Sequence, residues 1–254
     1  MNRTLHHSLG SAYRSFISSF GGSVMNLLSP QTGEFILDVG CGSGDIAGQL
    51  AKLGVQVIGI DQSENMIDQA KHKYPALHFE QMNALDLPYH EQFDTIFSND
   101  TLHLIQPPHL VVQNIYRALK PGGRFVAEFS GKNHVLRIIT EVLRQLDIFN
   151  IPYKNNSFPW YFPTVGEYST LLEQSQFYVT TAIHFERPVL LPGEDGLRNW
   201  LDSFATPLFQ GLTTETKHVI MTRVEDRLKE ELYEKDGWIA HFKQLRIHAI
   251  KTEH

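Results

Sequence analysis

The sequence is poor in cysteine and has no long apolar run. Cys41 is the single cysteine among 254 residues, so no intrachain disulfide can form. A membrane-spanning helix needs about 20 consecutive apolar residues, and no segment approaches that length. Residues Met1–His7 lead into no apolar region, so we expect neither a signal peptide nor a membrane partner. The cytoplasm is the expected location.

Positive charge is also scarce. Lys and Arg total 22 against 28 for Asp and Glu, and the formal net charge is -6 with histidine neutral. Nucleic-acid-binding domains usually carry a basic footprint, so we expect no nucleic-acid partner. We expect no metal site either. The length suffices for a full hydrophobic core, and we expect one domain with insertions.

The most informative segment begins with a short apolar run, Phe35–Val39, which contains Asp38 and has the composition of a buried parallel strand. The glycines that follow stand at alternate positions: Gly40, Gly42 and Gly44. Helical spacing begins at Asp45. A strand, a glycine turn and a helix N-terminus are together typical of a nucleotide-binding site.

The loop differs from the two common phosphate-binding loops. A dinucleotide-binding loop would have its third glycine at position 45, which is Asp45 here. A P-loop needs a lysine, and this loop has none. Two carboxylates, Asp38 and Asp45, bracket the turn. Negative charge is unfavourable for a pyrophosphate and suits a cationic ligand.

The pattern D-x-G-x-G-x-G resembles the cofactor loop of the class I S-adenosylmethionine-dependent methyltransferases, whose cofactor carries a sulfonium and an ammonium but no phosphate. The resemblance implies S-adenosyl-L-methionine as cofactor. It assigns these loop residues to its binding: Asp38, Gly40, Cys41, Gly42 and Gly44. The alternative is a glycine turn without a ligand. Cys41 is expected to fill the tight turn rather than act as a nucleophile.

Strands and helices alternate along the first half of the chain, as in a doubly wound α/β sheet. We predict seven strands: Phe35–Val39, Val55–Ile60, His78–Gln81, Phe93–Ser98, Arg124–Phe129, Phe177–Phe185 and Phe242–Ile250. The resemblance implies a Rossmann-like sheet whose last strand runs antiparallel beside the fifth. We predict a single methyltransferase domain over residues 1–254. N-terminal helices fall within residues 1–30, and helical lid insertions span 133–162 and 194–235.

Asp61 ends the second predicted strand. A carboxylate there can accept hydrogen bonds from both ribose hydroxyls of a nucleoside, a geometry shared with dehydrogenases. The alternative is that Asp61 caps the following helix. The neighbouring Gln62 and Met66 are candidates to pack on adenine.

Two further cofactor contacts are implied by the resemblance. Asn83-Ala84 resembles the family's Asp-Ala pair, which contacts adenine, with asparagine in place of the aspartate. Asn99, at the end of the fourth strand, fits the position whose backbone faces the methionine moiety. The family members that methylate amino groups of nucleic acids carry an Asn/Asp-Pro-Pro-aromatic tetrad at this point, and this chain does not. Transfer to a small molecule is therefore favoured.

Candidate residues at the methyl acceptor are fewer. His103 follows the fourth strand and can act as a base, as a hydrogen-bond donor to substrate, or only as a lining residue. From about residue 10 to its end the chain resembles trans-aconitate methyltransferase and its relatives, most strongly over residues 34–130. That similarity implies a carboxylate acceptor, with Trp160, Tyr161 and Arg246 as substrate contacts.

We therefore predict S-adenosylmethionine-dependent methyl transfer to a small molecule by a monomer or homodimer. The acceptor is a carboxylate in the first hypothesis and a quinone or another natural-product intermediate in the second. A third hypothesis is a protein that binds S-adenosylmethionine without turnover. Arsenic methylation relies on several cysteines and is not expected here.

Overall fold

The computed structural model describes residues 24–151 and 158–253. The chain divides into two compact units. Unit 1 comprises the described residues of Met1–Phe129, Gly166–Ile183 and Arg246–His254, and unit 2 those of Ser130–Val165 and His184–Leu245. The N-terminal helices expected before residue 24 lie outside the described residues.

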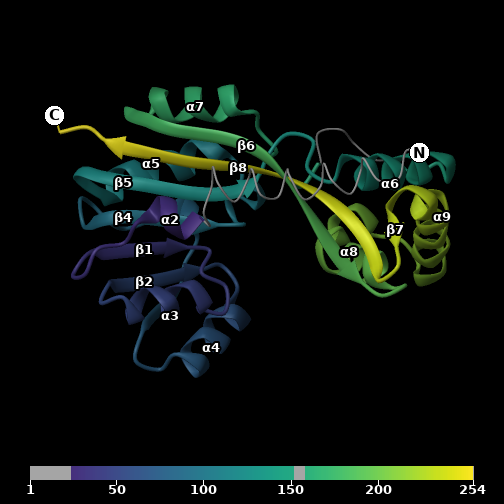
Figure 1. Cartoon of the computed structure of the whole chain (residues 1–254), viewed down its shortest axis with the longest axis horizontal. Helices are drawn as coiled ribbons and strands as arrows, with labels where there is room; N and C mark the ends of the chain where they lie inside the picture. Colours follow the sequence, from purple (N-terminus) through teal and green to yellow (C-terminus); the bar gives the residue numbers. More distant parts are fainter. Residues whose placement is uncertain (1–23, 152–157, 254) are drawn as a thin grey trace, which may run out of the picture. The chain divides into compact units, whose positions relative to one another are not determined.

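Eight strands form one sheet in the described part of the chain. They are β1 (Phe35–Val39), β2 (Gln56–Asp61), β3 (His78–Gln81), β4 (Phe93–Asn99), β5 (Leu119–Ser130), β6 (Phe177–Pro192), β7 (Tyr233–Glu234) and β8 (Gly237–Lys251). Their order is β3-β2-β1-β4-β5-β8-β6, with β7 pairing on β8. The predicted insertion of the last long strand beside the fifth is confirmed, and the arrowhead of β8 points opposite to that of β1 (Figure 1).

The strands at the centre of unit 1 are parallel. Leu37 of β1 lies opposite Ile58 of β2 on one side and Ile96 of β4 on the other. The pairs β2–β3 and β4–β5 are parallel as well. Parallel strands present their carboxyl ends at one edge, so the loops after β1, β2, β3 and β4 meet there.

Short helices connect these strands: α2 (Val24–Leu28), α3 (Asp45–Lys52), α4 (Glu64–Lys73), α5 (Pro108–Ala118), α7 (Val165–Gln174) and the 3-10 turns η1 (Ala84–Asp86) and η2 (Leu102–Leu104). Ser63 caps α4, since its side chain accepts a hydrogen bond from the Met66 amide. Apolar faces of these helices and of the strands form a core that contains Leu28, Ile36 and Phe97, all fully buried.

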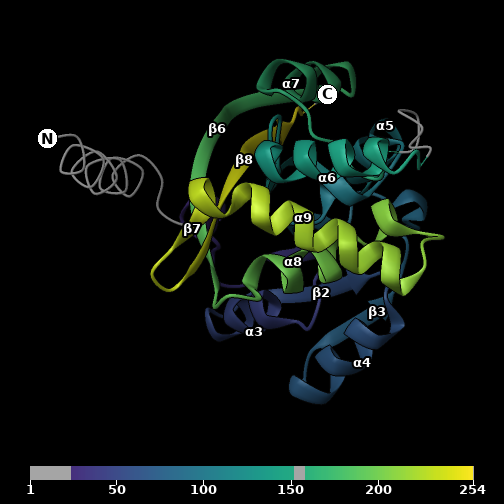
Figure 2. The same cartoon turned by 90° about the vertical axis from the view of Figure 1, so that its right-hand side faces the viewer.

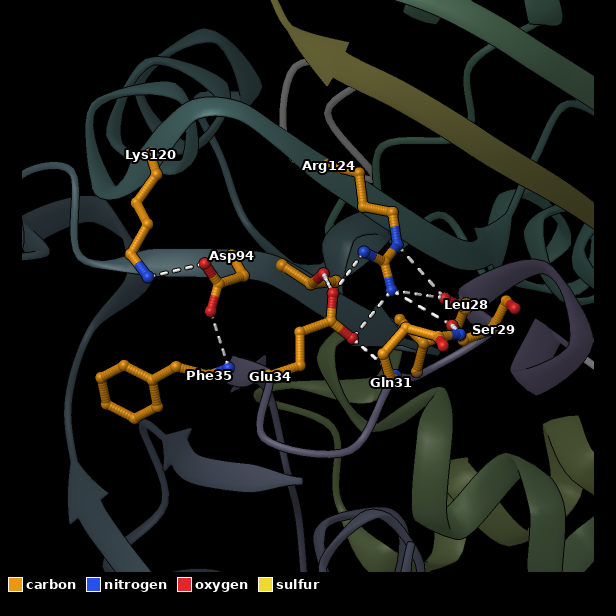
Figure 3. A network of polar contacts seen from close by, with 9 residues as sticks. Leu28, Ser29, Gln31, Glu34, Phe35, Asp94, Lys120 and Arg124 are labelled. Carbon is orange, nitrogen blue, oxygen red and sulfur yellow. Dashed lines mark hydrogen bonds and ion pairs between the residues drawn. The ribbon is translucent and has the colours of Figure 1, made fainter. Parts of the chain in front are cut away.

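A polar network ties α2 to the amino ends of the central strands (Figure 3). Arg124 of β5 forms an ion pair with Glu34 and also donates to the Leu28 carbonyl at 2.8 Å. Lys120 donates to Asp94 at 2.6 Å beside it. These charges lie at the edge of the sheet opposite to the loops that follow β1, β2 and β4.

Unit 2 has its own hydrophobic core. Its helices are α6 (Leu136–Ile148), α8 (Gly196–Phe204), the 3-10 turn η4 (Thr206–Phe209) and α9 (Thr214–Leu232). Figure 2 shows α6, α8 and α9 gathered in this unit. Each of the three helices contributes a fully buried residue to the core: Val142 from α6, Leu201 from α8 and Val224 from α9. Both predicted insertions, 133–162 and 194–235, fall largely within unit 2. Their role as a lid stays a prediction.

The sheet and the second insertion differ from the prediction. The two-residue strand β7 raises the strand number from seven to eight. Strand β6 continues past Phe185 to Pro192. Glu186, Arg187 and Pro188 interrupt the apolar pattern there, and most side chains of the extension are half-buried or exposed. Pro207 and the left-handed Gly211 separate α8 from α9 within the region predicted as helical. Among the described residues, no helix combines the length and apolar character that a bilayer crossing needs.

Candidate functional site

A cavity of about 350 Å³ opens at the carboxyl ends of the central strands of unit 1. Its lining residues come from the loops after β1, β2, β3 and β4: Val39, Gly40, Ile60, Asp61, Gln62, Ser63, Met82, Asn83, Ala84, Thr101, Leu104 and Ile105. Five predicted cofactor residues are among them, from three separate stretches of sequence. This is the position at which ligands bind to open parallel sheets.

The glycine loop passes close to the segment after β4. Gly40 has a left-handed backbone with φ of 75°, and its amide donates to the Ile60 carbonyl at 2.8 Å. A Cβ atom on Gly40 would lie 2.1 Å from the hydroxyl of Thr101. That hydroxyl lies 3.0 Å from the Asn99 carbonyl and 3.3 Å from the Gly40 carbonyl, and it can donate its one proton to either. Only glycine fits at position 40.

Asp61 connects the loop to the end of β2. Its Oδ2 accepts a hydrogen bond from the Gly42 amide at 3.0 Å, and its Oδ1 accepts from the Ser63 amide at 2.8 Å. Ser63, not Asp61, caps α4. A Cβ atom on Gly42 would meet nothing within 4 Å, so the backbone there is open to close approach.

Asp38 and Cys41 lie behind the loop rather than in the lining. Asp38 is buried in β1, and its Oδ2 has no hydrogen-bond partner. Burial, reinforced by the nearby Asp61 charge, raises the pKa of Asp38 to about 7. Burial also raises the pKa of the Cys41 thiol well above its ordinary value, so this thiol stays protonated and unreactive.

Asp45 does not face the cavity, which corrects the interpretation that two carboxylates bracket the ligand. Its side chain forms an ion pair with Lys73 and accepts hydrogen bonds of 2.9 Å from Tyr74 and Ser43. The hydrogen bond from Lys73 is the main cause that lowers the pKa of Asp45 to about 2. Its negative charge is used within the protein.

The residues expected near adenine divide into two groups. Gln62, Asn83 and Ala84 line the cavity, whereas Met66 is 38% exposed and is not a lining residue. The Asn83 carboxamide oxygen accepts a hydrogen bond from the Leu85 amide at 2.9 Å, which caps η1 and fixes the orientation of the side chain.

The segment after β4 contains Asn99 and His103. The Asn99 side chain donates to Asp100 at 3.1 Å and is not part of the lining. His103 lies half-buried in η2, between lining residues Thr101 and Leu104, but is itself outside the lining. The turn therefore brings His103 near the cavity without exposing it there.

The three predicted substrate residues belong to different units. Trp160, in unit 2, stacks on Phe162 with ring centroids 5.9 Å apart and packs against the core of that unit. Tyr161 is its half-buried neighbour. Arg246, in unit 1, is buried and bonds Glu128, with Nε 2.7 Å from Oε2. Arg246 is thus one half of an internal ion pair.

Seven lining residues were not among the predicted site residues: Val39, Ile60, Ser63, Met82, Thr101, Leu104 and Ile105. Each stands at the carboxyl end of β1, β2, β3 or β4 or follows it within a few residues, at the same sheet edge as the glycine loop. Position directly after a parallel strand was the available signal, but it selects no residue type.

Known proteins share this domain. Residues 37–127 match the family model of a methyltransferase domain. Uncharacterized methyltransferase C70.08c of Schizosaccharomyces pombe is 29% identical over 248 residues, which cover 93% of this chain and 94% of that protein. A demethylmenaquinone methyltransferase of Oceanobacillus iheyensis is 38% identical over 111 residues, covering 40% of this chain and 47% of its own length.

The fold is shared with solved structures. Protein BH2331 of Bacillus halodurans, described as a methyltransferase, superposes with a TM-score of 0.64 at 19% identity, covering 90% of this chain and 97% of its own. The matched segment, residues 37–127, contains the glycine loop and Asp61. The relatives and the solved structure named above are methyltransferases as well. Residues 37–127 therefore form a methyltransferase domain, and the whole chain is similar in sequence and in fold to methyltransferases.

Proposed function

We propose that the cavity of unit 1 binds S-adenosyl-L-methionine and that the enzyme transfers a methyl group to a small-molecule acceptor. When bound, this cofactor supplies an electrophilic methyl group on a sulfonium. The observation that carries the proposal is the position of the Asp61 carboxylate, which accepts a hydrogen bond from the Gly42 amide of the glycine loop and also lines the cavity.

The remaining acceptor capacity of Asp61 suits a ribose. A carboxylate offers about four lone-pair positions, and backbone amides occupy one on each oxygen. One position per oxygen is left, which matches two adjacent hydroxyl donors. The open backbone at Gly42 leaves room for the ligand beside them.

The size and walls of the cavity fit a nucleoside. Its volume of about 350 Å³ lies within the range of small-molecule sites, about 300–1,000 Å³. Apolar side chains such as Val39, Ile60 and Ile105 form walls against which a flat base can pack. Asn83 would contact the adenine edge through lone pairs and donors not used by Leu85, without the charge of the family's aspartate.

The chain's own task is mainly alignment. Methyl transfer from a sulfonium is an in-line displacement, so the protein has to orient the acceptor and exclude water. An acceptor with a weakly acidic hydroxyl also needs a base, and His103 is our candidate. A carboxylate acceptor needs none.

The acceptor we favour is an uncharged ring, such as a quinone precursor or another natural-product intermediate. A carboxylate such as trans-aconitate is the alternative, and it needs cationic partners. Arg246, the cation predicted to contact such an acceptor, is paired with Glu128, so an acidic acceptor would have to compete with that carboxylate. The partial match to a demethylmenaquinone methyltransferase also supports a ring acceptor.

Calorimetry with S-adenosylmethionine and its demethylated product tests the cofactor first. No binding below about 1 mM would refute the proposed site. Methyl-labelled cofactor is then incubated with trans-aconitate, with a reduced naphthoquinone and with a simple phenol. Label on the ring compounds supports our acceptor, label on trans-aconitate alone supports the carboxylate, and binding without any transfer supports a cofactor-binding protein.

A further inference from the structure

We propose that Thr101 is a positioning residue for the cofactor, a role that rests on the proposed function. Its hydroxyl group holds the carbonyl of Gly40, and with it the glycine loop, in the conformation that binds S-adenosylmethionine. Thr101 follows β4 and is one of the residues that line the cavity of unit 1. It was not among the site residues expected from the sequence.

The Thr101 hydroxyl does not serve as a helix cap. Thr101 is the N-cap residue of η2, and an N-cap threonine ordinarily accepts a hydrogen bond from a backbone amide two or three residues on. Its side chain makes no such capping bond. Its Oγ1 instead lies 3.3 Å from the carbonyl oxygen of Gly40 and 3.0 Å from that of Asn99. Capping therefore does not explain where this hydroxyl points.

The two carbonyl groups belong to neighbouring strand ends. Gly40 directly follows β1 and Asn99 is the last residue of β4, and these strands pair in parallel. A hydroxyl has one proton, so it donates to one of the carbonyl groups at a time. The contact with Asn99 lies within one short segment, whereas the contact with Gly40 joins positions 61 residues apart. Thr101 thus connects the segment after β4 to the loop after β1.

The carbon atoms of Thr101 pack on Gly40. Both Cβ and Cγ2 occupy the space in which a Cβ atom of residue 40 would stand. The Gly40 amide, on the other side, donates to the Ile60 carbonyl at 2.8 Å. The backbone at Gly40 is therefore held by β2 through its amide and by Thr101 through its carbonyl and its open face.

The direction of the Gly40 carbonyl also determines the start of the glycine loop. A peptide group is planar, so this carbonyl sets the direction of the Cys41 amide, which donates to a β2 carbonyl at 2.9 Å. The next amide, of Gly42, donates to Asp61, the proposed ribose acceptor. A rotation of the Gly40 peptide would disturb both bonds. The Thr101 hydroxyl thereby preorganises the loop, and its loss would add a conformational cost to cofactor binding.

Two substitutions separate the hydroxyl from the carbon atoms of Thr101. Thr101→Val keeps the shape of the side chain and removes the hydroxyl, whereas Thr101→Ser keeps the hydroxyl and removes Cγ2. Calorimetry measures the affinity for S-adenosylmethionine and its demethylated product. We expect Thr101→Val to weaken binding of both compounds at least about fivefold, the effect of one lost neutral hydrogen bond.

Thr101→Ser should bind both compounds within about twofold of the wild type, since it can still donate to Gly40. Its urea denaturation midpoint should nevertheless fall, because the packing of Cγ2 on Gly40 is lost. A residue with a purely structural role would show affinity and stability falling together. Should Thr101→Val fail to fold, Thr101→Ala replaces it, because it differs from Thr101→Ser only by the hydroxyl oxygen.

Thr32→Val is the matched control. Thr32 also packs on a left-handed glycine, Gly54, and its hydroxyl also donates to a backbone carbonyl, that of Leu53 at 3.2 Å. It precedes β1, away from the cavity lining. Thr32→Val should therefore leave both affinities within about twofold of the wild type.

The possible outcomes distinguish this role from the proposed function. If the wild type binds neither compound, the proposed function fails and the role of Thr101 fails with it. If the wild type binds but the variant without the hydroxyl binds equally well, only the role of Thr101 is overturned. The same holds if Thr101→Ser binds as weakly as that variant, or if Thr32→Val weakens binding as much.

Discussion

The carboxylate of Asp61 accepts a hydrogen bond of 3.0 Å from the backbone amide of Gly42. Asp61 ends β2 and Gly42 lies in the loop after β1, and these strands are parallel neighbours. One side chain therefore holds the glycine loop and presents its remaining lone pairs to the cavity. These hydrogen bonds therefore fix both the glycine loop and the proposed ribose acceptor, Asp61, in the ligand-free protein.

Asp61→Ala should weaken binding of S-adenosylmethionine and its demethylated product at least tenfold. It removes both the proposed ribose acceptor and the loop's tether, and tenfold corresponds to about 1.4 kcal/mol. Calorimetry measures the change. Asp68→Ala, an exposed carboxylate on α4 outside the lining, is the control. Equal affinity of Asp61→Ala and wild type would remove Asp61 from the ribose contact.

Gly40→Ala should destabilise the free protein by about 2–4 kcal/mol in urea denaturation. A left-handed backbone costs an alanine about 1–2 kcal/mol, and the clash with Thr101 adds an overpacking penalty. Gly33→Ala separates the two effects. Gly33 has φ of 84°, and a Cβ atom added there would meet nothing within 4 Å, so only the backbone cost applies. Equal losses in the two variants would contradict the contact with Thr101.

Asp38 predicts a pH dependence of stability. Its pKa is about 7 in the folded protein against an ordinary value of 3.8. Between these values the folded state holds a proton that the unfolded state has released, so the free energy of unfolding falls as pH rises. Asp38→Asn removes this dependence. The stability of wild type relative to Asp38→Asn should therefore decrease from about pH 4 to pH 7, by up to about 4 kcal/mol.

Chemical denaturation of both proteins at several pH values measures the difference. A relative stability that stays flat or rises over this range would show that Asp38 is ionised in the folded protein.

His103→Ala should lower turnover at least about 100-fold if His103 is the base for a hydroxyl acceptor. Affinity for the demethylated cofactor should stay within about twofold, because His103 lies outside the cavity lining. Single-turnover methylation assays and calorimetry separate the two quantities. His109→Ala, an exposed histidine on α5, is the control. Unchanged turnover would make His103 a neighbour of the site without a chemical role.

Arg124→Gln should destabilise the protein by about 2–3 kcal/mol in urea denaturation. The change leaves Glu34, which is 9% exposed, without its cation and removes the bond to the Leu28 carbonyl (Figure 3). Arg137→Gln breaks an exposed ion pair with Glu231 and should cost less than about 1 kcal/mol. Similar losses in both variants would mean that the network of Figure 3 contributes no more than a surface pair.

Local elements were predictable where burial has a simple period. Strands Phe35–Val39 and His78–Gln81 match the structure in both bounds. Their apolar patterns depend only on neighbours a few residues away. The outer part of β6 was missed because its side chains are mostly half-exposed and show no such period.

The position of the glycine loop was predictable, but not every contact of its residues. Gly40, Asp61 and Asn83 line the cavity as expected, whereas Asp45 and Met66 do not. The Asp45 side chain sits in the first turn of α3 and is close enough to Lys73 to pair with it. Nothing in the spacing of the loop distinguishes this pairing from a contact with a ligand.

By itself the sequence determined the alternation of strands and helices, the glycine loop and the carboxylate after the second strand. These follow from local periodicity and from residue types that few other structures tolerate. Only the tertiary structure decided that Thr101 packs against Gly40, that Lys73 forms an ion pair with Asp45 and that Arg246 forms an ion pair with Glu128. Such partners are distant along the chain, and ion pairs and hydrogen bonds form only between groups that folding brings within about 4 Å.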